Sequence, residues 1–423
     1  MSYTSNRANL AAQLPSKSVA VFTANELMPR NGDEFFPFRQ QSDFYYLTGI
    51  DAENAFLLVA PDYPDESLRE VLFIEPYDEV KVTWQGEMLD AKQASEISGI
   101  KTVKGSDAFW MTLNDIAYSG YGDVIFLNSY EYPKYECPVE TIQQRFNRQV
   151  KERYPMHQYD RTAPILNALR IVKSEDEIKI TQQACNITAK AFRRCLETVK
   201  PGMYEYEVQA EIEYIFKRNN ASGHAYAPII AGGKNACCLH YSKNQDLLHD
   251  GDLLLFDIGC EYRNYSSDLS RTIPVNGKFT PRQRDCYNAV LRVTKEITQL
   301  YRPGHCINEI NETTHRLMEK EMIQLGLFTE EDVNRQNPEK PLERKYLMHG
   351  MSHHIGLDVH DSIDKFKPFA PGMILTCEPG IYIREEGIGI RIENDLLITE
   401  GAPINLFEGL PTEIEEIEAA MQR

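Results

Sequence analysis

The sequence has few of the features that mark secreted or disulfide-bonded proteins. Its nine cysteines are odd in number and include no Cys-x-x-Cys pair, and they lie at positions 137, 185, 195, 237, 238, 260, 286, 306 and 377. This pattern is typical of thiols that stay reduced. We therefore expect the cysteines to be packing residues.

Long apolar runs and an excess of basic residues are also absent. No 18 apolar residues follow one another, and the opening segment MSYTSNRANLAAQLPSKS lacks a charged stretch followed by an apolar core. Lys and Arg total 45 against 63 Asp and Glu, so the formal charge is −18, which disfavours nucleic acids and anionic membranes as partners. We expect a cytoplasmic protein that binds neither.

The chain is long enough for two domains, since 423 residues exceed one ordinary core. The first part alternates polar helical stretches with β-rich runs, at 18–24, 43–50, 55–61, 70–76 and 123–128, which indicates an α/β domain. A charged, proline-containing segment then precedes an S-x-x-E capping box at Ser174 to Glu177. We place the boundary between domains 1–165 and 166–423.

The second part of the sequence repeats itself. Pro-Gly pairs at 201–202 and 303–304 each end one helix and precede another, and each half then reaches an apolar strand. The two strands end in Asp257 and Glu378, and each of these acids lies six residues after a glycine. The fold class expected from this pattern is a two-domain α/β protein with an internally duplicated second domain.

A second carboxylate follows each of these acids, namely Asp268 and Glu393. Two β-hairpins would set Asp257 opposite Asp268 and Glu378 opposite Glu393. Duplicated halves usually pack about a pseudo-twofold axis, so we expect the four acids to face one another. Four such carboxylates cannot all stay ionised inside a protein without cations, and a pair of divalent metal ions would meet this need.

The segment MHGMSHHIGLDVHD (348–361) contains four of the ten histidines. Histidine is a frequent ligand of transition metals, although spacing alone does not choose between His353 and His354. Oxygen ligands with one imidazole and no thiolate suit Mn²⁺, Co²⁺ or Zn²⁺, and Mn²⁺ best. Arg391 precedes Glu393 by two residues on the same strand face, so we expect it to orient carboxylates by a bidentate pair.

Several segments together resemble aminopeptidase P, a family of proline peptidases. They are HGMSHHIGLDVHD (349–361), FDIGCEYRNYSSDLSRTIPVNGKFT (256–280), LTCEPGIYI (375–383) and GIGIRIENDLLIT (387–399), with RNGDEFFPFRQQSDFYYLTGID (30–51) similar to the family's amino-terminal domain. The resemblance implies a creatinase-like α/β N-terminal domain and a pita-bread catalytic domain with a curved, antiparallel-rich sheet. It also implies a dinuclear metal centre, which agrees with the repeat.

By motif position, the resemblance implies the metal ligands Asp257, Asp268, His353, Glu378 and Glu393, with Asp268 and Glu393 bridging the ions. It selects His353 because the pattern H-G-x-S-H places the ligand fifth, which leaves His354 a supporting or structural role. The resemblance further implies that His240, His349 and His360 contact the substrate near its scissile carbonyl.

The implied activity is hydrolysis of the bond between an N-terminal residue and a following proline. A metal-bridged hydroxide would attack the carbonyl, and Glu378 would relay the proton. The substrates would be peptides with proline at the second position. The N-terminal domain of the family often joins subunits, so we expect a homo-oligomer, a dimer or tetramer, in which Trp84 could reach a neighbour's site.

Other functions remain open at this point. An Xaa-Pro dipeptidase, or prolidase, is the main alternative, although no arginine stands out as a receptor for the carboxylate of a dipeptide. A non-catalytic peptide-binding relative or a creatinase-like enzyme would lack the ligands, and a methionine aminopeptidase would not need the long first domain.

Overall fold

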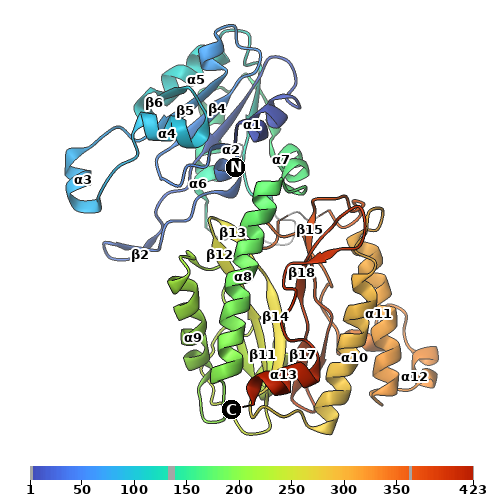
Figure 1. The fold of residues 1–423 in the computed structure, drawn as a ribbon. Coiled ribbons are helices and arrows are strands. Elements are labelled where there is room, and N and C mark those ends of the chain that lie inside the picture. Colours follow the sequence, from blue (N-terminus) through green and yellow to red (C-terminus); the bar gives the residue numbers. More distant parts are fainter. Residues whose placement is uncertain (1–2, 132–138, 362–363, 423) are drawn as a thin grey trace. The chain divides into compact units, whose positions relative to one another are not determined.

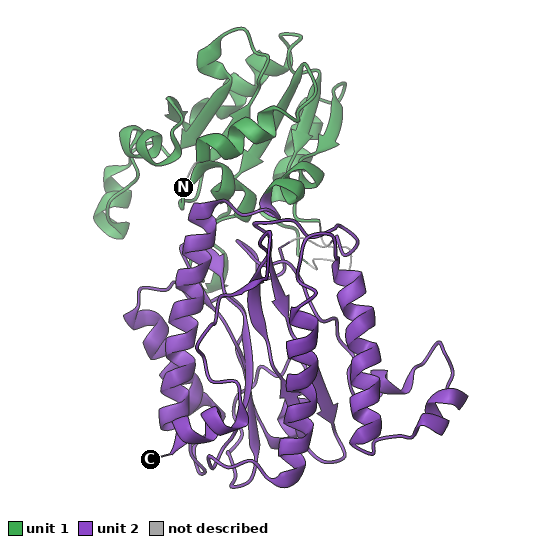
Figure 2. Cartoon of the chain, turned by 45° about the vertical axis from the view of Figure 1, so that its right-hand side comes forward, with its two compact units in different colours: residues 1–169 green, residues 170–423 purple. Residues whose placement is uncertain are grey.

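The computed structural model describes residues 3–131, 139–361 and 364–422. The chain forms two compact units, residues 1–169 and 170–423 (Figure 2). The boundary expected between residues 165 and 166 falls within helix α7 (Ala163–Arg170), at whose last residue the second unit begins.

The first unit is built on a six-stranded mixed sheet (Figure 1). Its strand order is β6 (Thr102–Gly105), β5 (Glu70–Ile74), β4 (Phe56–Val59), β1 (Ser18–Thr23), β7 (Val124–Leu127) and β8 (Gln158–Arg161). Strand β4 is antiparallel to both of its neighbours, and the other pairs are parallel. The unit also contains α1 (Tyr3–Ala11), α2 (Ser42–Thr48), α3 (Glu79–Gln85), α4 (Ala91–Ser98), α5 (Phe109–Ala117), α6 (Ile142–Arg153) and the hairpin β2 (Pro29–Asn31) to β3 (Glu34–Phe35).

Four of the five β-rich runs form strands, but the prediction for 43–50 is wrong, because this segment forms helix α2. The Gln41 side chain caps the helix by accepting a hydrogen bond from the backbone N–H of Phe44, and Gly49 ends it in the left-handed conformation. All seven residues of α2 are buried, so no polar face reveals the helical period. An aromatic run without that period has the composition of a strand.

The second unit contains the duplicated halves. The first half comprises α8 (Glu175–Thr198), α9 (Glu205–Arg218), β9 (Gly223–His224), β10 (Ile229–Gly232), β11 (Leu253–Ile258), β12 (Cys260–Tyr262), β13 (Tyr265–Ser266) and β14 (Leu269–Pro274). The second comprises α10 (Pro281–Thr298), α11 (Ile307–Gln324), α12 (Glu330–Arg335), β15 (Ile374–Cys377), β16 (Gly380–Ile383), β17 (Ile388–Arg391), β18 (Asn394–Leu397), β19 (Ile404–Asn405) and α13 (Ile414–Met421). Helices α8 and α9 lie side by side, as do α10 and α11 (Figure 1).

Local signals start the long helices as expected. The Ser174 hydroxyl caps α8 and the Thr280 hydroxyl caps α10, in each case within a full capping box. The two halves meet along β14, where the backbone N–H of Glu393 donates to the carbonyl of Ser270 at 3.0 Å. This seam brings the carboxylates of both halves to one place.

The hairpin pairing of the four acids is predicted correctly in one half only. Strands β15 and β18 pair Cys377 with Asn394, so the register places Glu378 across from Glu393. In the other hairpin Asp257 pairs with Ser270 and not with Asp268. The cause is the tight turn at 263–264, whose residues have φ of 50° and 65°. This turn lies one residue beyond the centre that the expected pairing required, and a shift of one residue there moves each partner by two.

Six of the cysteines are buried and fit the expected packing role, namely Cys185, Cys195, Cys237, Cys260, Cys286 and Cys377. Cys306 is half-buried and Cys238 is exposed, so for Cys238 the expectation is wrong. Cys137 lies outside the described residues. Over the described ranges, no helix has the length and apolarity needed to span a membrane.

Candidate active site

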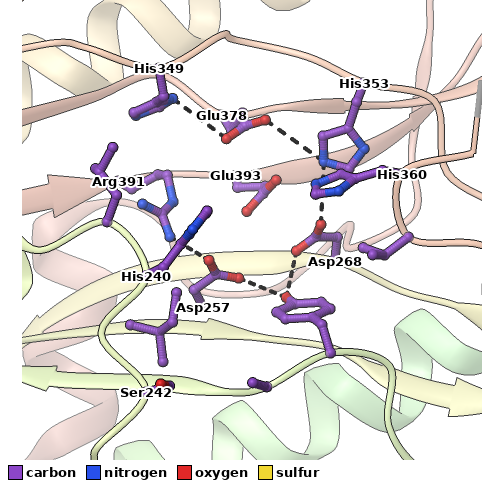
Figure 3. A pocket seen from close by; sticks show the side chains of 15 residues that line it. His240, Ser242, Asp257, Asp268, His349, His353, His360, Glu378, Arg391 and Glu393 are labelled. Atoms are coloured by element: carbon purple, nitrogen blue, oxygen red, sulfur yellow. Dashed lines mark hydrogen bonds and ion pairs between the residues drawn. The ribbon is translucent and has the colours of Figure 1, made fainter. Parts of the chain in front are cut away.

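All nine residues singled out in the sequence line one cavity of about 360 Å³ in the second unit (Figure 3). They are Asp257, Asp268, His353, Glu378, Glu393, His240, His349, His360 and Arg391. Tyr226, Leu239, Ser242 and Val359 are also in its wall. The cavity therefore gathers residues that lie up to 167 positions apart in the chain, from Tyr226 to Glu393.

Strand ends position the four carboxylates. Asp257 is the penultimate residue of β11 and Asp268 directly precedes β14, while Glu378 directly follows β15 and Glu393 directly precedes β18. Asp268 is 5% exposed and Glu393 is 2% exposed. Although Asp257 and Asp268 are not direct cross-strand partners, a two-residue offset keeps both on the same sheet face.

Burial and mutual repulsion act strongly on three of these acids. Burial, followed by the charge of Asp257, raises the pKa of Asp268 well above its usual range. Burial, followed by the charge of Asp268, does the same to the pKa of Glu393. Burial and the charge of Glu393 raise the pKa of Glu378 to about 8. Asp268, Glu378 and Glu393 are therefore poorly suited to remain ionised without added positive charge.

The His353 ring presents a free nitrogen to these acids. Its Nδ1 lies 3.2 Å from the carbonyl oxygen of His354, which can only accept, so Nδ1 carries the proton. Its Nε2 lies 3.5 Å from Asp268 Oδ2 and 3.8 Å from Glu378 Oε1. Asp268, His353 and Glu393 each offer a ligand atom, and these three atoms lie within 4.8 Å of one another. This arrangement can hold a cation.

Arg391 is in the site, but it does not form the expected bidentate pair. One terminal nitrogen, Nη2, donates to Asp257 Oδ2 at 2.5 Å, while Nη1 donates to the Tyr382 hydroxyl at 2.7 Å. Nε donates at 2.7 Å to the Ser270 hydroxyl, which in turn donates to Glu393 Oε2 at 2.7 Å. The guanidinium thus orients two carboxylates, because each of its nitrogens donates to a different oxygen. It contacts Asp257 directly and Glu393 through the Ser270 hydroxyl.

The other histidines occupy distinct positions around the carboxylates. His349 donates from Nδ1 to the Gly350 carbonyl at 2.7 Å, and its Nε2 accepts from the Tyr382 hydroxyl at 2.8 Å. Burial and the charge of Arg391 lower its pKa to about 3, so the ring is neutral. The His360 ring packs edge-on against His353, with centroids 4.4 Å apart. His240 is exposed at the rim.

The segment that carries His353 and His360 is held by a buried ion cluster. Asp361 Oδ2 accepts from Lys173 Nζ at 2.8 Å, and Asp361 also pairs with Arg170. The side chain of Lys173 is 1% exposed and that of Asp361 is 3% exposed. Gly356 makes room for this pair, since a Cβ there would lie 2.5 Å from Asp361 Oδ2.

Sequence reasoning missed several residues that support the site. The Tyr226 hydroxyl lies 2.7 Å from Asp257 Oδ1 and 2.5 Å from Asp268 Oδ1, so a single proton faces two carboxylates. Asp395 is fully buried and accepts from the backbone N–H of Asp268 at 3.0 Å. Asp395 follows Glu393 by two residues, and that spacing on a strand was a signal that both face one side. Tyr226 had no comparable signal.

The donor set fits divalent cations. It combines carboxylate oxygens with one imidazole, it contains no thiolate, and two of its acids are almost fully buried. Carboxylate and imidazole ligands together suit Mn²⁺, Co²⁺ and Zn²⁺.

Comparisons with known proteins cover the whole chain. Residues 179–400 match metallopeptidase family M24, and residues 3–125 match the aminopeptidase P N-terminal domain. The Xaa-Pro aminopeptidase of Escherichia coli K12 is 35% identical over 98% of this chain and 96% of that protein. The human Xaa-Pro aminopeptidase 3 is 29% identical over 96% of this chain and 81% of that protein.

Solved structures agree with the sequence comparisons. Zn-substituted aminopeptidase P of E. coli, in complex with product, has a TM-score of 0.88 at 33% identity and covers 99% of this chain and 97% of that chain. Proline aminopeptidase P II from Yersinia pestis has a TM-score of 0.87 at 34% identity, covering 99% of this chain and 98% of that chain. The expected two-domain α/β fold with a pita-bread second domain is confirmed. The chain therefore belongs to metallopeptidase family M24, among its members that carry the aminopeptidase P N-terminal domain.

Proposed function

We propose that this protein is a metal-dependent Xaa-Pro aminopeptidase, which hydrolyses the bond between an N-terminal residue and a following proline. The convergence of four carboxylates and His353 on one cavity is the observation that carries this conclusion. The similarity to Xaa-Pro aminopeptidases along the whole chain supports the choice of substrate.

Two divalent ions, with Mn²⁺ preferred, are part of the proposal. Asp268 and Glu393 would be shared between the ions, Asp257 would complete one set, and His353 with Glu378 would complete the other. Asp268, His353 and Glu393 already lie at ligand spacing, and the remaining acids line the same cavity. When bound, such ions supply Lewis acidity and a nucleophile derived from water at neutral pH.

The chain's own groups would handle the proton and the substrate. Glu378 would accept the proton of the attacking water, because its carboxylate lies beside the shared ligands and is 17% exposed. His240 and His360, exposed at the rim, would contact the substrate near the scissile carbonyl. His349 lines the same cavity, with its ring held by Gly350 and Tyr382, and it would also contact the substrate near the scissile carbonyl.

The charge of the described cavity wall favours an aminopeptidase over a dipeptidase. Among the described residues that line the cavity, Arg391 is the one Lys or Arg, and its three donor groups already meet Asp257, Ser270 and Tyr382. A dipeptidase must bind the free carboxylate that directly follows proline, which calls for an available cation. Proline itself has no N–H to grip, so recognition depends on the shape of the wall.

Removal of metal should abolish hydrolysis. Without cations the buried carboxylates take up protons and the nucleophile is not generated, so we expect dialysis against a chelator to stop cleavage of an Xaa-Pro peptide. Added Mn²⁺ should restore more activity than Co²⁺ or Zn²⁺. Full activity of protein that contains no metal by elemental analysis would contradict the proposal.

The adjacent histidines should differ sharply when each is replaced. His353→Ala removes the imidazole ligand, so we expect kcat/KM to fall by at least about 100-fold and the metal content per folded protein to drop. His354→Ala leaves every proposed ligand in place and costs mainly stability, because this fully buried ring would leave a cavity. Mass spectrometry of bound metal distinguishes the two variants. Equal loss of metal in both would show that His353 is not the specific ligand.

Substrate length should distinguish the two peptidase activities. We expect a higher kcat/KM for Xaa-Pro-Yaa and longer peptides than for Xaa-Pro dipeptides, because the described residues of the cavity wall offer no available cation for a carboxylate directly after proline. Replacement of the proline by alanine should reduce cleavage to near background. Faster cleavage of the dipeptide, measured by release of the first residue, would identify a prolidase instead.

A homo-oligomer, either a dimer or a tetramer, and a cytoplasmic location complete the proposal. Helix α3 has no buried residue, and Trp84 is 83% exposed, with Val80 66% and Tyr77 74% exposed nearby in sequence. Exposed apolar groups of this kind are typical of surfaces that bind protein, and a second copy of the chain is the proposed occupant. The free thiols of the eight described cysteines accord with a reducing compartment.

Trp84→Glu tests the oligomer. We expect a smaller particle by light scattering, because a carboxylate would be buried without a partner at the proposed contact. Met111→Glu is the matched control, since Met111 is 66% exposed on α5 of the same unit. An unchanged mass in Trp84→Glu, or a monomeric parent protein, would exclude this role of α3.

A further inference from the structure

His240 lines the cavity, but no hydrogen bond, ion pair or ring contact to a described residue holds its imidazole. It lies in residues 238–246, a segment that contains no helix or strand. Within the part of the chain that the structure describes, its imidazole has no hydrogen bond, ion pair or ring contact, and it is exposed. Its position therefore depends on how the backbone of this segment is held.

The side chain next to His240 points the other way. Leu239, His240 and Ser242 line the cavity, whereas Tyr241 does not. The Tyr241 hydroxyl donates instead to Glu205 Oε2 at 2.7 Å. Glu205 is the first residue of α9, so this bond joins the segment to a helix of the same half.

Glu205 holds the chain on both sides of His240. Its Oε1 accepts from the backbone N–H of Gly232 at 2.8 Å and from Asn235 Nδ2 at 3.0 Å. Its Oε2 accepts from the Tyr241 hydroxyl and from the backbone N–H of Asp246 at 2.9 Å. A carboxylate has about four acceptor sites, and all of these donors come from residues 232–246.

Glu205 is a buried carboxylate whose two oxygens are fully used by hydrogen bonds to this part of the chain. The residue is 0% exposed, and a buried carboxylate needs hydrogen-bond donors to remain stable as an anion. Four donors and the positive end of the α9 dipole meet that need. The mechanism proposed above uses neither Glu205 nor Tyr241, since neither lines the cavity.

A second residue of α9 supports the far end of the segment. Gln209 Oε1 accepts from Asn244 Nδ2 at 3.0 Å, and Asn244 Oδ1 accepts from the backbone N–H of Ile230 at 3.0 Å. Asn244 is 3% exposed and has a φ of 48°, a left-handed conformation that asparagine tolerates better than most residues. Helix α9 thus fixes the segment at several points.

We propose that Glu205 is a positioning residue that acts through Tyr241 and Asp246 to hold His240 at the substrate side of the cavity. The inference rests on the proposed function, because it gives His240 a role in contacting the peptide. Loss of the Tyr241 bond would let the segment move, because no described residue forms a hydrogen bond, ion pair or ring contact with the His240 imidazole that would keep it in place.

A double-mutant cycle tests the coupling. Tyr241→Phe removes one hydroxyl and keeps the ring, and we expect it to lower kcat/KM for an Xaa-Pro peptide by about tenfold. In a His240→Ala background the same change should cost less than about twofold, because the group to be positioned is gone. An equal loss in both backgrounds would overturn the proposal.

A matched control separates positioning from general stability. Tyr287 is fully buried in the same unit, and its hydroxyl donates to the Thr412 carbonyl at 2.8 Å. Tyr287→Phe should lower thermal stability without lowering kcat/KM and without coupling to His240→Ala. Glu205→Gln should also lower kcat/KM, because only one of the two side-chain oxygens remains to accept from the four donors.

Hydrogen exchange tests the anchor without any activity. In Tyr241→Phe and Glu205→Gln, deuterium uptake of peptides that cover 239–246 should rise relative to the parent protein, while Tyr287→Phe should leave it unchanged. Unchanged uptake in both anchor variants would refute the anchor. If the variants show these differences in uptake but the parent protein cleaves no Xaa-Pro peptide, the proposed function is refuted and the anchor by Glu205 still stands.

Discussion

Repulsion among the carboxylates at the seam between the two halves is the constraint on which the rest of the site depends. Asp268 and Glu393 are almost fully buried, and their raised pKa values express the cost of keeping two anions there. Arg391 is the one guanidinium among the described residues of the cavity wall, and it offsets only part of that cost. Divalent cations would offset the remainder, so ion binding and the stability of the second unit are linked.

The fold meets this constraint by bringing acids from separate strands to one seam and by holding each histidine differently. His353 is oriented by a backbone carbonyl, His349 by Tyr382 and Gly350, and His360 by ring packing. These are local contacts, each made within the second half. A site that combines rigid acids with histidines on loops can keep its charge arrangement fixed while its rim adapts to a peptide.

The four carboxylates of the site could be predicted from strand ends and from the duplication, whereas the choice of His353 and of the substrate-side histidines rested on the resemblance to aminopeptidase P. Other features depended on tertiary structure. Helix α2 is buried on all sides, so its sequence has no amphipathic period. The predicted partner of Asp257 was wrong because the turn at 263–264 lies one residue further along than a pairing with Asp268 requires. Arg391 divides its fork among oxygens whose positions only the folded chain defines, and Tyr226 is a single polar residue without any periodic signal.

The buried cluster around Asp361 determines where the two units can be cut apart. The capping box at Ser174 marks the start of helix α8. The two cations that pair with Asp361 are Arg170 and Lys173, and both precede that start. A fragment that began at Ser174 would keep α8 intact and still strand the Asp361 carboxylate, and removing the partners of a buried ion typically costs about 3 to 5 kcal/mol. The minimal length of the catalytic unit is therefore set by charge, and it extends at least five residues upstream of α8, to Arg170.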